Sequence, residues 1–599
     1  MEKAQTDTMP SEFSGRIQLR QELLFWITAG VLLFVFLDTS SFRESEAFRA
    51  EAFREMLLAG NLFQPLFNWE NIYDVSFLSY WLLVPFVKVF GFTEFAFRLP
   101  GVFAALAALY GVRMTGRGLF DEKSAFLCSW LFLGSVAFLL WGRTGNAEIG
   151  GVAGAICAVG WYFRSRHNGG FVSWLVFYML CFAGAFCSGL PALLVPAAVV
   201  LPLSLCSQKK CRNEIWKNAS AFLLAAFIFA VAFHLPVFFL VVPGEEKTSI
   251  GAALFLFFKQ NLREIAFFLR QFDWKEYFFN LGVFLPKVLL PWSPLLLAGC
   301  IGLLKNWKQL SSEVKITLIS VTAAALLCPL TGMKNSLLPV APLVLILGGG
   351  GIVFAVRQGE KWSRWVVAGA CYIMITAASA AFCSFAVYPL WGKLTVFSLP
   401  PSLMLWTVAA GAAAWFALFL DHRRNNVLTV VTGLPHRLGS TILAGTVLTG
   451  CCMSVLQPVI HSEFGCDKKF FEQLHSLALR ELHGYASERI VFYRTPVPGG
   501  FLFYNRLFSP VSHTASVKET ALRFPDTKVI FVLKEEPALL EEFQKECSRL
   551  NTAPLAVSLS PVRSLCCGGE VHYSVFPAVL PQISKQAAPH KEMKNENSR

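Results

Sequence analysis

The chain has 599 residues, of which 55% are hydrophobic and only 15% are charged. A mean hydropathy of +0.52 excludes an ordinary soluble domain, in which about a quarter of the residues carry a charge. The net charge of +13 would suit nucleic acid or anionic lipid, but in a membrane protein Lys and Arg residues mainly fix orientation. We therefore expect a polytopic membrane protein that does not bind nucleic acid.

Apolar stretches of roughly 20 residues, long enough to cross a bilayer, recur from Leu23 to about Leu456. The first follows Arg16 and Arg20 but has no small-residue cleavage site after it, which favours a retained span over a signal peptide. Residues 1–21 then form a cytoplasmic N-terminus. The pattern predicts about thirteen transmembrane helices, at residues 22–38, 98–115, 122–141, 146–163, 171–187, 189–206, 219–243, 279–304, 313–330, 335–356, 364–388, 401–420 and 437–457.

One further apolar stretch, residues 76–92, determines the topology. If it does not cross, the short outside connections hold only Arg143, Lys334 and Lys393, and the inside connections hold most of the basic residues. If it did cross, every later loop would change sides and the charge bias would invert. We therefore expect residues 39–92 to form juxtamembrane helices on the outer face.

From residue 459 onward the chain turns polar and mixed, so the membrane domain is assigned to residues 22–458. Residues 459–582 are predicted to form a small extracytoplasmic α/β domain, with a helix at 536–550 and strands at 490–493, 501–504, 528–533 and 571–576. The final residues, 583–599, are polar and basic, and are expected to be a disordered tail.

The loop after the first span, SSFRESEAFRAEAFREMLLAG, combines charges with phenylalanines. Glu46, Arg49 and Phe53 recur at i, i+3 and i+7, which places them on one face of a predicted helix. The simplest interpretation is an amphipathic interfacial helix with solvated ion pairs. Two more acids, Asp74 and Glu148, are expected on the same side of the membrane. Three carboxylates from separate segments could bind a divalent metal, with Asp74 and Glu46 as ligands, or share general-base work.

Several blocks of the chain match a known pattern: REMLLAGN, SFLSYWLLVPFVKVFGFTEFAFRLPGVFAALAALYG, WGRTGNAE, FLPKVLLPWSPLLL and LLPVAPLVLIL. They resemble the polyprenyl-phosphate-sugar-dependent glycosyltransferases of the C-type fold (glycosyltransferase families 39 and 83). Within that group the chain is similar to the aminoarabinose transferases that modify lipid A and, more distantly, to the protein O-mannosyltransferases. Residues 91–111 are the most specific part.

The resemblance implies that a sugar moves from a polyprenyl-phosphate donor to a lipid, glycan or protein acceptor at the outer face of the inner membrane. The N-terminus would be cytoplasmic and the C-terminal domain extracytoplasmic. The donor is carried by a lipid, so no nucleotide-binding fold is needed, and the chain has neither a P-loop nor a G-x-G-x-x-G motif after a strand.

This chain departs from the family pattern at motifs that carry charge. The family's Asp-Glu pair, its Glu-Lys pair, its Arg-Thr-Asp and its Lys-Gly-Pro turn read here as Ser45-Glu46, Asp74-Val75, Asn146-Ala147-Glu148 and Ser188-Gly189-Leu190. A serine cannot replace the aspartate as a proton acceptor unaided, because its pKa lies far above neutrality. The lost lysines would have balanced the donor phosphate.

The resemblance therefore implies a rebuilt site. Glu46 or Glu148 would act as general base, Asp74 would orient a metal or the loop helix, and Arg143, Lys334 or Arg49 would bind the donor phosphate. Two alternatives stay open. One is a catalytically weak or inactive relative that binds lipid or glycan on the same scaffold. The other is a transporter, which the absence of an internal repeat disfavours.

Overall fold

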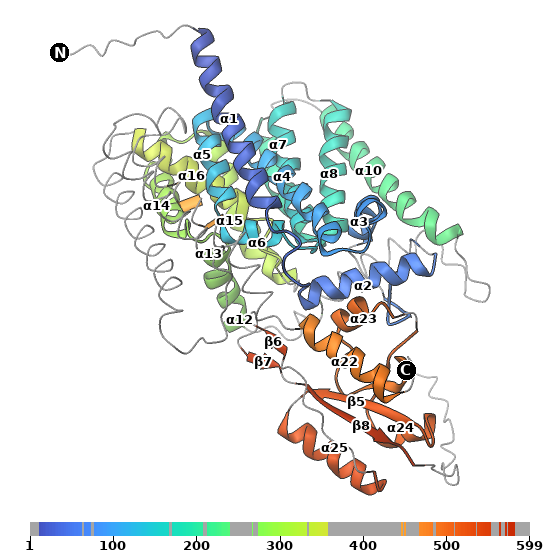
Figure 1. Ribbon diagram of the computed structural model, residues 1–599. Coiled ribbons are helices and arrows are strands. Elements are labelled where there is room, and N and C mark those ends of the chain that lie inside the picture. The colour runs from blue at the N-terminus through green and yellow to red at the C-terminus, as the bar shows by residue number, and fades with distance from the viewer. Residues whose placement is uncertain are drawn as a thin grey trace, which may run out of the picture. The chain divides into compact units, whose positions relative to one another are not determined.

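The computed structural model divides the chain into two compact units, which are described one at a time. The first unit comprises residues 1–40, 60–64 and 73–459, and the second comprises residues 41–59, 65–72 and 460–599. Figure 1 shows their elements. The structure describes residues 11–60, 62, 65–72, 77–166, 170–207, 212–239, 266, 274–331, 335–357, 442, 445–446, 449–450, 467–482, 487–507, 509–534, 536–552, 562–564, 569–571 and 573–581.

The first unit is helical throughout its described residues. Its elements are α1 (Ser11–Phe34), α3 (Phe77–Phe90), α4 (Glu94–Leu119), α5 (Glu122–Leu133), α6 (Val136–Gly142), α7 (Glu148–Ser165), α8 (Phe171–Ser188), α9 (Pro191–Ser207), α10 (Arg212–Phe239), α12 (Trp274–Phe279), η2 (Asn280–Phe284), α13 (Leu285–Val288), α14 (Ser293–Lys305), η3 (Trp307–Gln309), α15 (Ser312–Leu327), η4 (Cys328–Thr331) and α16 (Ala341–Arg357).

Among the described residues, three helices are long and apolar enough to span a bilayer, namely α4, α8 and the continuous segment Ser312–Thr331. Two bent pairs also qualify if each pair is counted as one span: α5 with α6, bent by 65°, and Leu281–Val288 with α14, bent by 109°. The sequence predicted spans at residues 122–141 and 279–304, and the structure adds a sharp bend within each of these segments. Predicted spans from residue 358 to 441 lie outside the described residues.

A backbone hydrogen bond joins the break between α5 and α6 to the break before α14. The Val136 N–H, the first of α6, donates to the Leu290 carbonyl at 2.8 Å, and Leu290 lies in the break before α14. At the same place, a Cβ on Gly134 would come within 2.8 Å of the Trp292 ring. Pro291 has no N–H to continue a helix. Non-helical backbone at membrane depth persists only where protein groups satisfy it, and these two breaks do so together.

The ambiguous stretch at residues 76–92 folds as α3. Its 14 residues reach about 21 Å at the helical rise, which is short of the roughly 30 Å hydrocarbon core. This length agrees with the expectation that the segment does not cross, which remains a prediction.

Small residues set the spacing of α7 and α8, which run side by side (Figure 1). A Cβ added to Gly154 of α7 would lie 2.6 Å from the Cα of Gly184 in α8. In lipid there is little hydrophobic force between helices, so close backbone approach at small residues provides the packing contacts that hold them together.

The second unit contains a four-stranded sheet. Its elements are α2 (Glu44–Leu58), β1 (Leu66–Phe67), β2 (Glu70–Asn71), α22 (Asp467–Glu481), η7 (Ser487–Arg489), β3 (Ile490–Tyr493), α23 (Gly499–Asn505), β4 (Ser512–Thr514), α24 (Val517–Arg523), β5 (Lys528–Lys534), α25 (Pro537–Arg549), β6 (Val562–Ser564), β7 (Gly569–Val571) and β8 (Tyr573–Val579). The sheet order is β4-β3-β5-β8. β4, β3 and β5 are parallel, and β8 is antiparallel to β5.

Helices cover both faces of this sheet. α22 and α23 pack on one face, where Ile490 and Phe492 of β3 point. α24 and α25 pack on the other face, against Val491 and Tyr493. Because β3 is buried on both faces, its apolar run is continuous, as in other parallel strands.

The strand predicted at residues 501–504 is wrong, because these residues belong to helix α23. The side-chain amide of Asn505, the last residue of α23, donates to the Phe501 carbonyl at 2.9 Å, one helical turn back. A short apolar run fits a buried strand or a buried helix equally well, and periodicity alone cannot separate them.

The loop after α1 is divided between the two units. The sequence assigned residues 39–92 to the outer face of the membrane domain, whereas residues 41–59 and 65–72 pack with the C-terminal residues in the second unit. The cause is burial, because α2 buries Ala47, Ala50, Phe53 and Met56 almost completely.

Replacing Gly154 by valine should destabilise the first unit by about 1–3 kcal/mol, because the new side chain meets the Gly184 backbone. Gly30→Val is the matched control, since Gly30 is also helical and has nothing within 4 Å of an added Cβ. Unfolding of both variants in detergent measures the difference. Equal destabilisation by the two would contradict the packing argument.

Candidate functional site

Two buried arginines close the C-terminal end of α1. Arg98, in the first turns of α4, donates from Nη1 to the carbonyls of Leu37 at 2.7 Å and Ser40 at 2.9 Å. Arg143, directly after α6, donates to four further carbonyls in residues 32–36. The last carbonyls of a helix have no partner within it, and cations there also complement the helix dipole.

The contacts of Arg143 bear on its predicted role. Its Nη1 bonds the carbonyls of Leu32 and Leu33, and its Nη2 bonds those of Val35, at 2.6 Å, and Phe36. In this structure Arg143 therefore anchors the chain where it leaves α1. The sequence analysis did not single out Arg98, although it lies in the FRLPG run of the most specific block. In the sequence, the feature that could have pointed to Arg98 is a basic residue inside an apolar block.

A close contact fixes the turn between α6 and α7. A Cβ on Gly101 of α4 would come within 2.5 Å of the Thr144 carbonyl, and one on Gly142 within 2.9 Å of Ala105. The turn therefore lies directly against α4. The Thr144 hydroxyl donates to the Trp141 carbonyl at 3.0 Å, which ties the turn to the last residues of α6.

Glu148 begins α7 immediately after this turn and is half-buried. Throughout the described chain, no residue donates a hydrogen bond to its carboxylate or forms an ion pair with it. A helix N-terminus favours a negative charge. Glu148 is therefore an acid held at a defined place whose oxygens are not committed to a structural bond.

Ser188, the last residue of α8, faces the side of α7 on which Glu148 lies. Gly151, one turn after Glu148, faces the end of α8, where an added Cβ would overlap Ser188 Oγ. That hydroxyl is buried and has no hydrogen-bond partner among the residues that the structure describes. The following Gly189 has φ = +89°, a conformation that favours glycine, and it lets α8 turn directly into α9.

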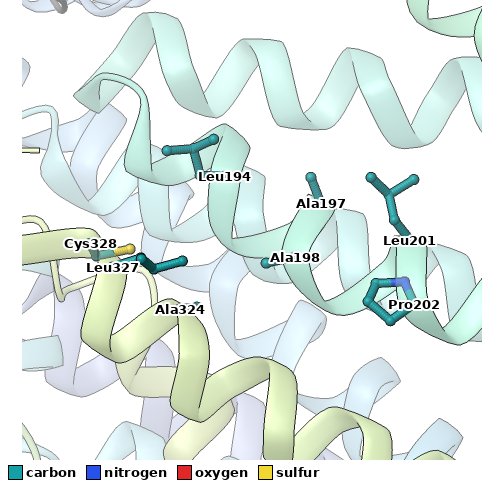
Figure 2. Close-up of a pocket in the computed structure, with 8 residues that line it drawn as sticks. All are labelled: Leu194, Ala197, Ala198, Leu201, Pro202, Ala324, Leu327 and Cys328. Carbon is teal, nitrogen blue, oxygen red and sulfur yellow. The ribbon is translucent and has the colours of Figure 1, made fainter. Parts of the chain in front are cut away.

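An apolar cavity of about 370 Å³ lies between α9 and α15 (Figure 2). Its α9 wall begins a few residues after Gly189, and Figure 2 labels the lining residues of both helices. The lining residues are Leu194, Ala197, Ala198, Leu201 and Pro202 on α9, and Ala324, Leu327 and Cys328 on the facing segment. The wall offers almost no polar group, so the cavity suits a hydrocarbon chain.

The predicted residues on α2 lie in the second unit. Glu46 is 2% exposed, and its Oε2 accepts the Arg43 backbone N–H at 3.1 Å, which caps the start of the helix. Arg49 is half-buried on the same helix. Asp74 and Lys334 lie outside the described residues.

Two observations on the described residues concern the predicted metal site. Within the described ranges, no group of three or more His, Cys, Asp or Glu side chains is arranged to hold a metal ion. Glu46, one of the two predicted ligands, caps its own helix.

Glu55 of α2 is a buried acid that the sequence analysis did not single out. It is 1% exposed, and its Oε2 accepts the Trp69 backbone N–H at 2.7 Å. The adjacent Glu51 is paired with Arg54 through two bonds of 2.6 and 2.7 Å. Burial, with a smaller contribution from Glu51, raises the pKa of Glu55 to about 8 against the opposing effects of the Trp69 N–H and Arg54.

The chain has the fold that the sequence predicted, the α-helical polytopic membrane fold of the C-type glycosyltransferases with a small C-terminal sheet region. Residues 74–237 match the family model described as dolichyl-phosphate-mannose-protein mannosyltransferase. The resemblance drawn from the sequence blocks is thereby confirmed.

Two crystal structures of ArnT from Cupriavidus metallidurans are similar to this chain. The apo structure has a TM-score of 0.59 at 14% identity, over 97% of this chain and 100% of that chain. The structure bound to undecaprenyl phosphate has a TM-score of 0.60 at 15% identity, over 95% and 99%. At this identity the likeness shows the fold. A search of curated proteins finds no match.

Arg143→Lys should destabilise the first unit by about 1–3 kcal/mol, because an ammonium cannot reach four carbonyls that the planar guanidinium bonds together. Arg164→Lys, at an exposed position of α7, is the control. Hydrogen exchange at the end of α1 measures the effect. Unchanged protection there in Arg143→Lys would contradict the anchoring role.

The second unit should lose stability as the pH rises. The folded state keeps Glu55 protonated up to about pH 8, whereas the unfolded chain ionises it near pH 4.5, so stability falls across this window and levels above it. Glu55→Gln, which can still accept the Trp69 N–H, should remove that part of the fall. Exchange of the β3 and β5 amides at the two ends of the window measures it.

Glu541→Gln, at an exposed position of α25, provides the control and should keep the wild-type dependence. An equal fall in the wild type and in Glu55→Gln would argue against a buried neutral carboxyl.

Proposed function

We propose that this chain is a membrane glycosyltransferase that moves a sugar from a polyprenyl-phosphate donor to the hydroxyl of a lipid, glycan or protein acceptor. The family match over residues 74–237 and the ArnT-like fold support this class of reaction. The observation that carries the proposal is Glu148, an uncommitted carboxylate fixed at the start of α7 by the Gly101–Thr144 contact.

The apolar cavity between α9 and α15 would take part of the donor's prenyl chain. Its volume of about 370 Å³ lies within the usual range for ligand pockets, about 300–1,000 Å³. The likeness to an ArnT structure that binds undecaprenyl phosphate supports such a donor. The cavity starts one to two helical turns along α9 from Gly189, which places the chain near the Glu148 end of the unit.

The reaction follows from this arrangement. Glu148 accepts the proton of the acceptor hydroxyl while the acceptor oxygen bonds the anomeric carbon. The bond from that carbon to the phosphate oxygen breaks, and the lipid phosphate leaves with the electron pair. Direct attack inverts the anomeric centre. Arg98 and Arg143 lie close enough to repel each other electrostatically, so their combined field would stabilise the phosphate without surrendering their carbonyl bonds.

The charge distribution supports an orientation with this end outside and the N-terminus in the cytoplasm. At the other end of α4, Arg113 pairs with Glu22 and Glu122, and Arg117 also contacts Glu122. Basic residues gather at the cytoplasmic ends of spans in inner-membrane proteins. The C-terminal domain would then be extracytoplasmic.

A catalytically weak relative that binds lipid or glycan is the second candidate. Ser45 replaces the family's aspartate, and the neighbouring Glu46 is engaged in capping its own helix. Ser188, moreover, replaces a lysine that would have faced the phosphate. These substitutions favour binding without efficient transfer.

Glu148→Gln should lower transfer about 100-fold or more, because removal of a general base costs roughly that factor, while donor binding is retained. Purified wild type and variant are compared for sugar transfer from polyprenyl-phosphate donors to a membrane extract. Glu46→Gln is the matched control, since glutamine can still accept the Arg43 N–H and keep the cap.

Loss of transfer in Glu46→Gln alone would move the base to Glu46. Donor binding without transfer by any of the proteins would favour the binding relative.

A further inference from the structure

The β1–β2 hairpin of the second unit turns through two residues in an unfavourable conformation. Phe67 pairs with Glu70, so the turn itself consists of Asn68 and Trp69. Their φ angles are +54° and +64°. Such a turn favours asparagine followed by glycine, because glycine takes a positive φ at no steric cost, and a bulky tryptophan is disfavoured there. Interactions outside the turn must therefore hold it.

Side chains on two sides of the hairpin supply these interactions. The Asn68 side chain exchanges two bonds with the Val511 backbone, at 2.7 and 2.9 Å. The Trp69 backbone N–H donates to Oε2 of Glu55 in α2, at 2.7 Å. The indole N–H of Trp69 is buried and has no hydrogen-bond partner among the described residues. The bond to Glu55 therefore ties the tryptophan half of the turn to α2.

Glu55 belongs to a pair of carboxyl groups that share a proton. Glu51, one helical turn before it, is also buried, and the two carboxyl groups are in hydrogen-bond contact. Such a contact requires a proton on one of them. Glu51 already accepts two bonds from Arg54, at 2.6 and 2.7 Å, and Arg54 also donates to the Leu507 carbonyl at 2.5 Å. Arg54 therefore compensates an ionised Glu51, and the proton belongs on Glu55.

The charges around Glu55 do not favour a second carboxylate. The charged groups that act on it are Glu51 and Arg54. Of the elements packed against α2, the hairpin carries Glu70 and α23 is followed by Arg506, and both of these side chains are exposed. When Glu55 loses its proton, two buried carboxylates share one guanidinium, and like charges four residues apart on a helix repel each other. Opening to water would relieve this repulsion.

We propose that Glu51, Glu55 and Arg54 form a proton-dependent latch, which holds the strained hairpin turn on α2 and releases it when the carboxyl pair loses its shared proton. Release separates Trp69 from Glu55, lets the turn relax and exposes both carboxylates to water. The opening is local, because the strands of the four-stranded sheet take no part in it. Glu55 ionises near pH 4.5 when open and near pH 8 when closed, so the latch weakens as the pH rises between these values and levels off above them.

The test uses the full chain in detergent and follows hydrogen exchange of the Trp69 and Ile72 amides, which are both bonded in the closed hairpin. Their protection relative to the intrinsic exchange rate should fall about tenfold per pH unit between pH 5 and pH 8, as expected for one proton. Glu55→Gln, which can still accept the Trp69 N–H, should remove this dependence. Glu70→Gln, at an exposed acid of the same hairpin, is the matched control and should keep it.

Glu51→Gln distinguishes a shared proton from simple packing. It removes the negative charge beside Glu55 and frees Arg54 to pair with that carboxylate, so the upper end of the pH window should move to lower pH. An unchanged upper end would overturn the shared proton. Protection that does not depend on pH in the wild type, or that depends on it equally in Glu55→Gln, would overturn the latch.

A low concentration of urea decides whether the opening is local. Amides of β3 and β5 exchange through unfolding of the unit and should lose protection as urea is added, whereas the hairpin amides should not, because a local opening exposes little surface. The same urea dependence at both places would assign the exchange to unfolding of the whole unit and would also overturn the proposal.

Discussion

Backbone polar groups inside a membrane need partners within the protein, and the described membrane unit is arranged around this constraint. Where α5 gives way to α6 and α13 gives way to α14, the two interruptions meet, and Val136 donates to the Leu290 carbonyl. Where α1 ends, Arg98 and Arg143 bond the exposed carbonyls. A polar side chain in such a chain therefore has a structural task before it has a chemical one.

The acids and bases that the sequence analysis grouped as one site therefore differ in the structure, because some of them are used in structural bonds and others are not. Arg143 and Glu46 have the residue types of a transfer site, yet one bonds carbonyls of α1 and the other caps α2. Glu148 is different, because the turn before it is fixed by glycine contacts and its carboxylate is not used to do so. Beside it, Ser188 places a buried hydroxyl at the end of α8.

The long apolar helices α4 and α8 were predictable from composition, because length and hydropathy are local properties. So was the α/β character of the C-terminal residues, from the runs that became β3 and β5. The bends at Gly134 and Pro291 depend on one another across the fold, and the helix at Phe501 depends on which surface covers it. The local periodicity of the sequence therefore predicts neither the bends nor this helix. The packing of α2 was not predictable for the same reason, since some of its partners lie more than 450 residues away.

That separation has a consequence for biosynthesis. α2 leaves the ribosome directly after the first span, but Gly499, to which it bonds, follows 455 positions later. At about 5–20 residues per second, synthesis of the intervening chain takes on the order of 20–90 s. During this interval α2 has only the β1–β2 hairpin of its unit beside it, because α23 and the rest of the α/β fold have not yet been made. The nascent chain therefore needs membrane surface or a chaperone to shield this helix until the last quarter of the protein has been made.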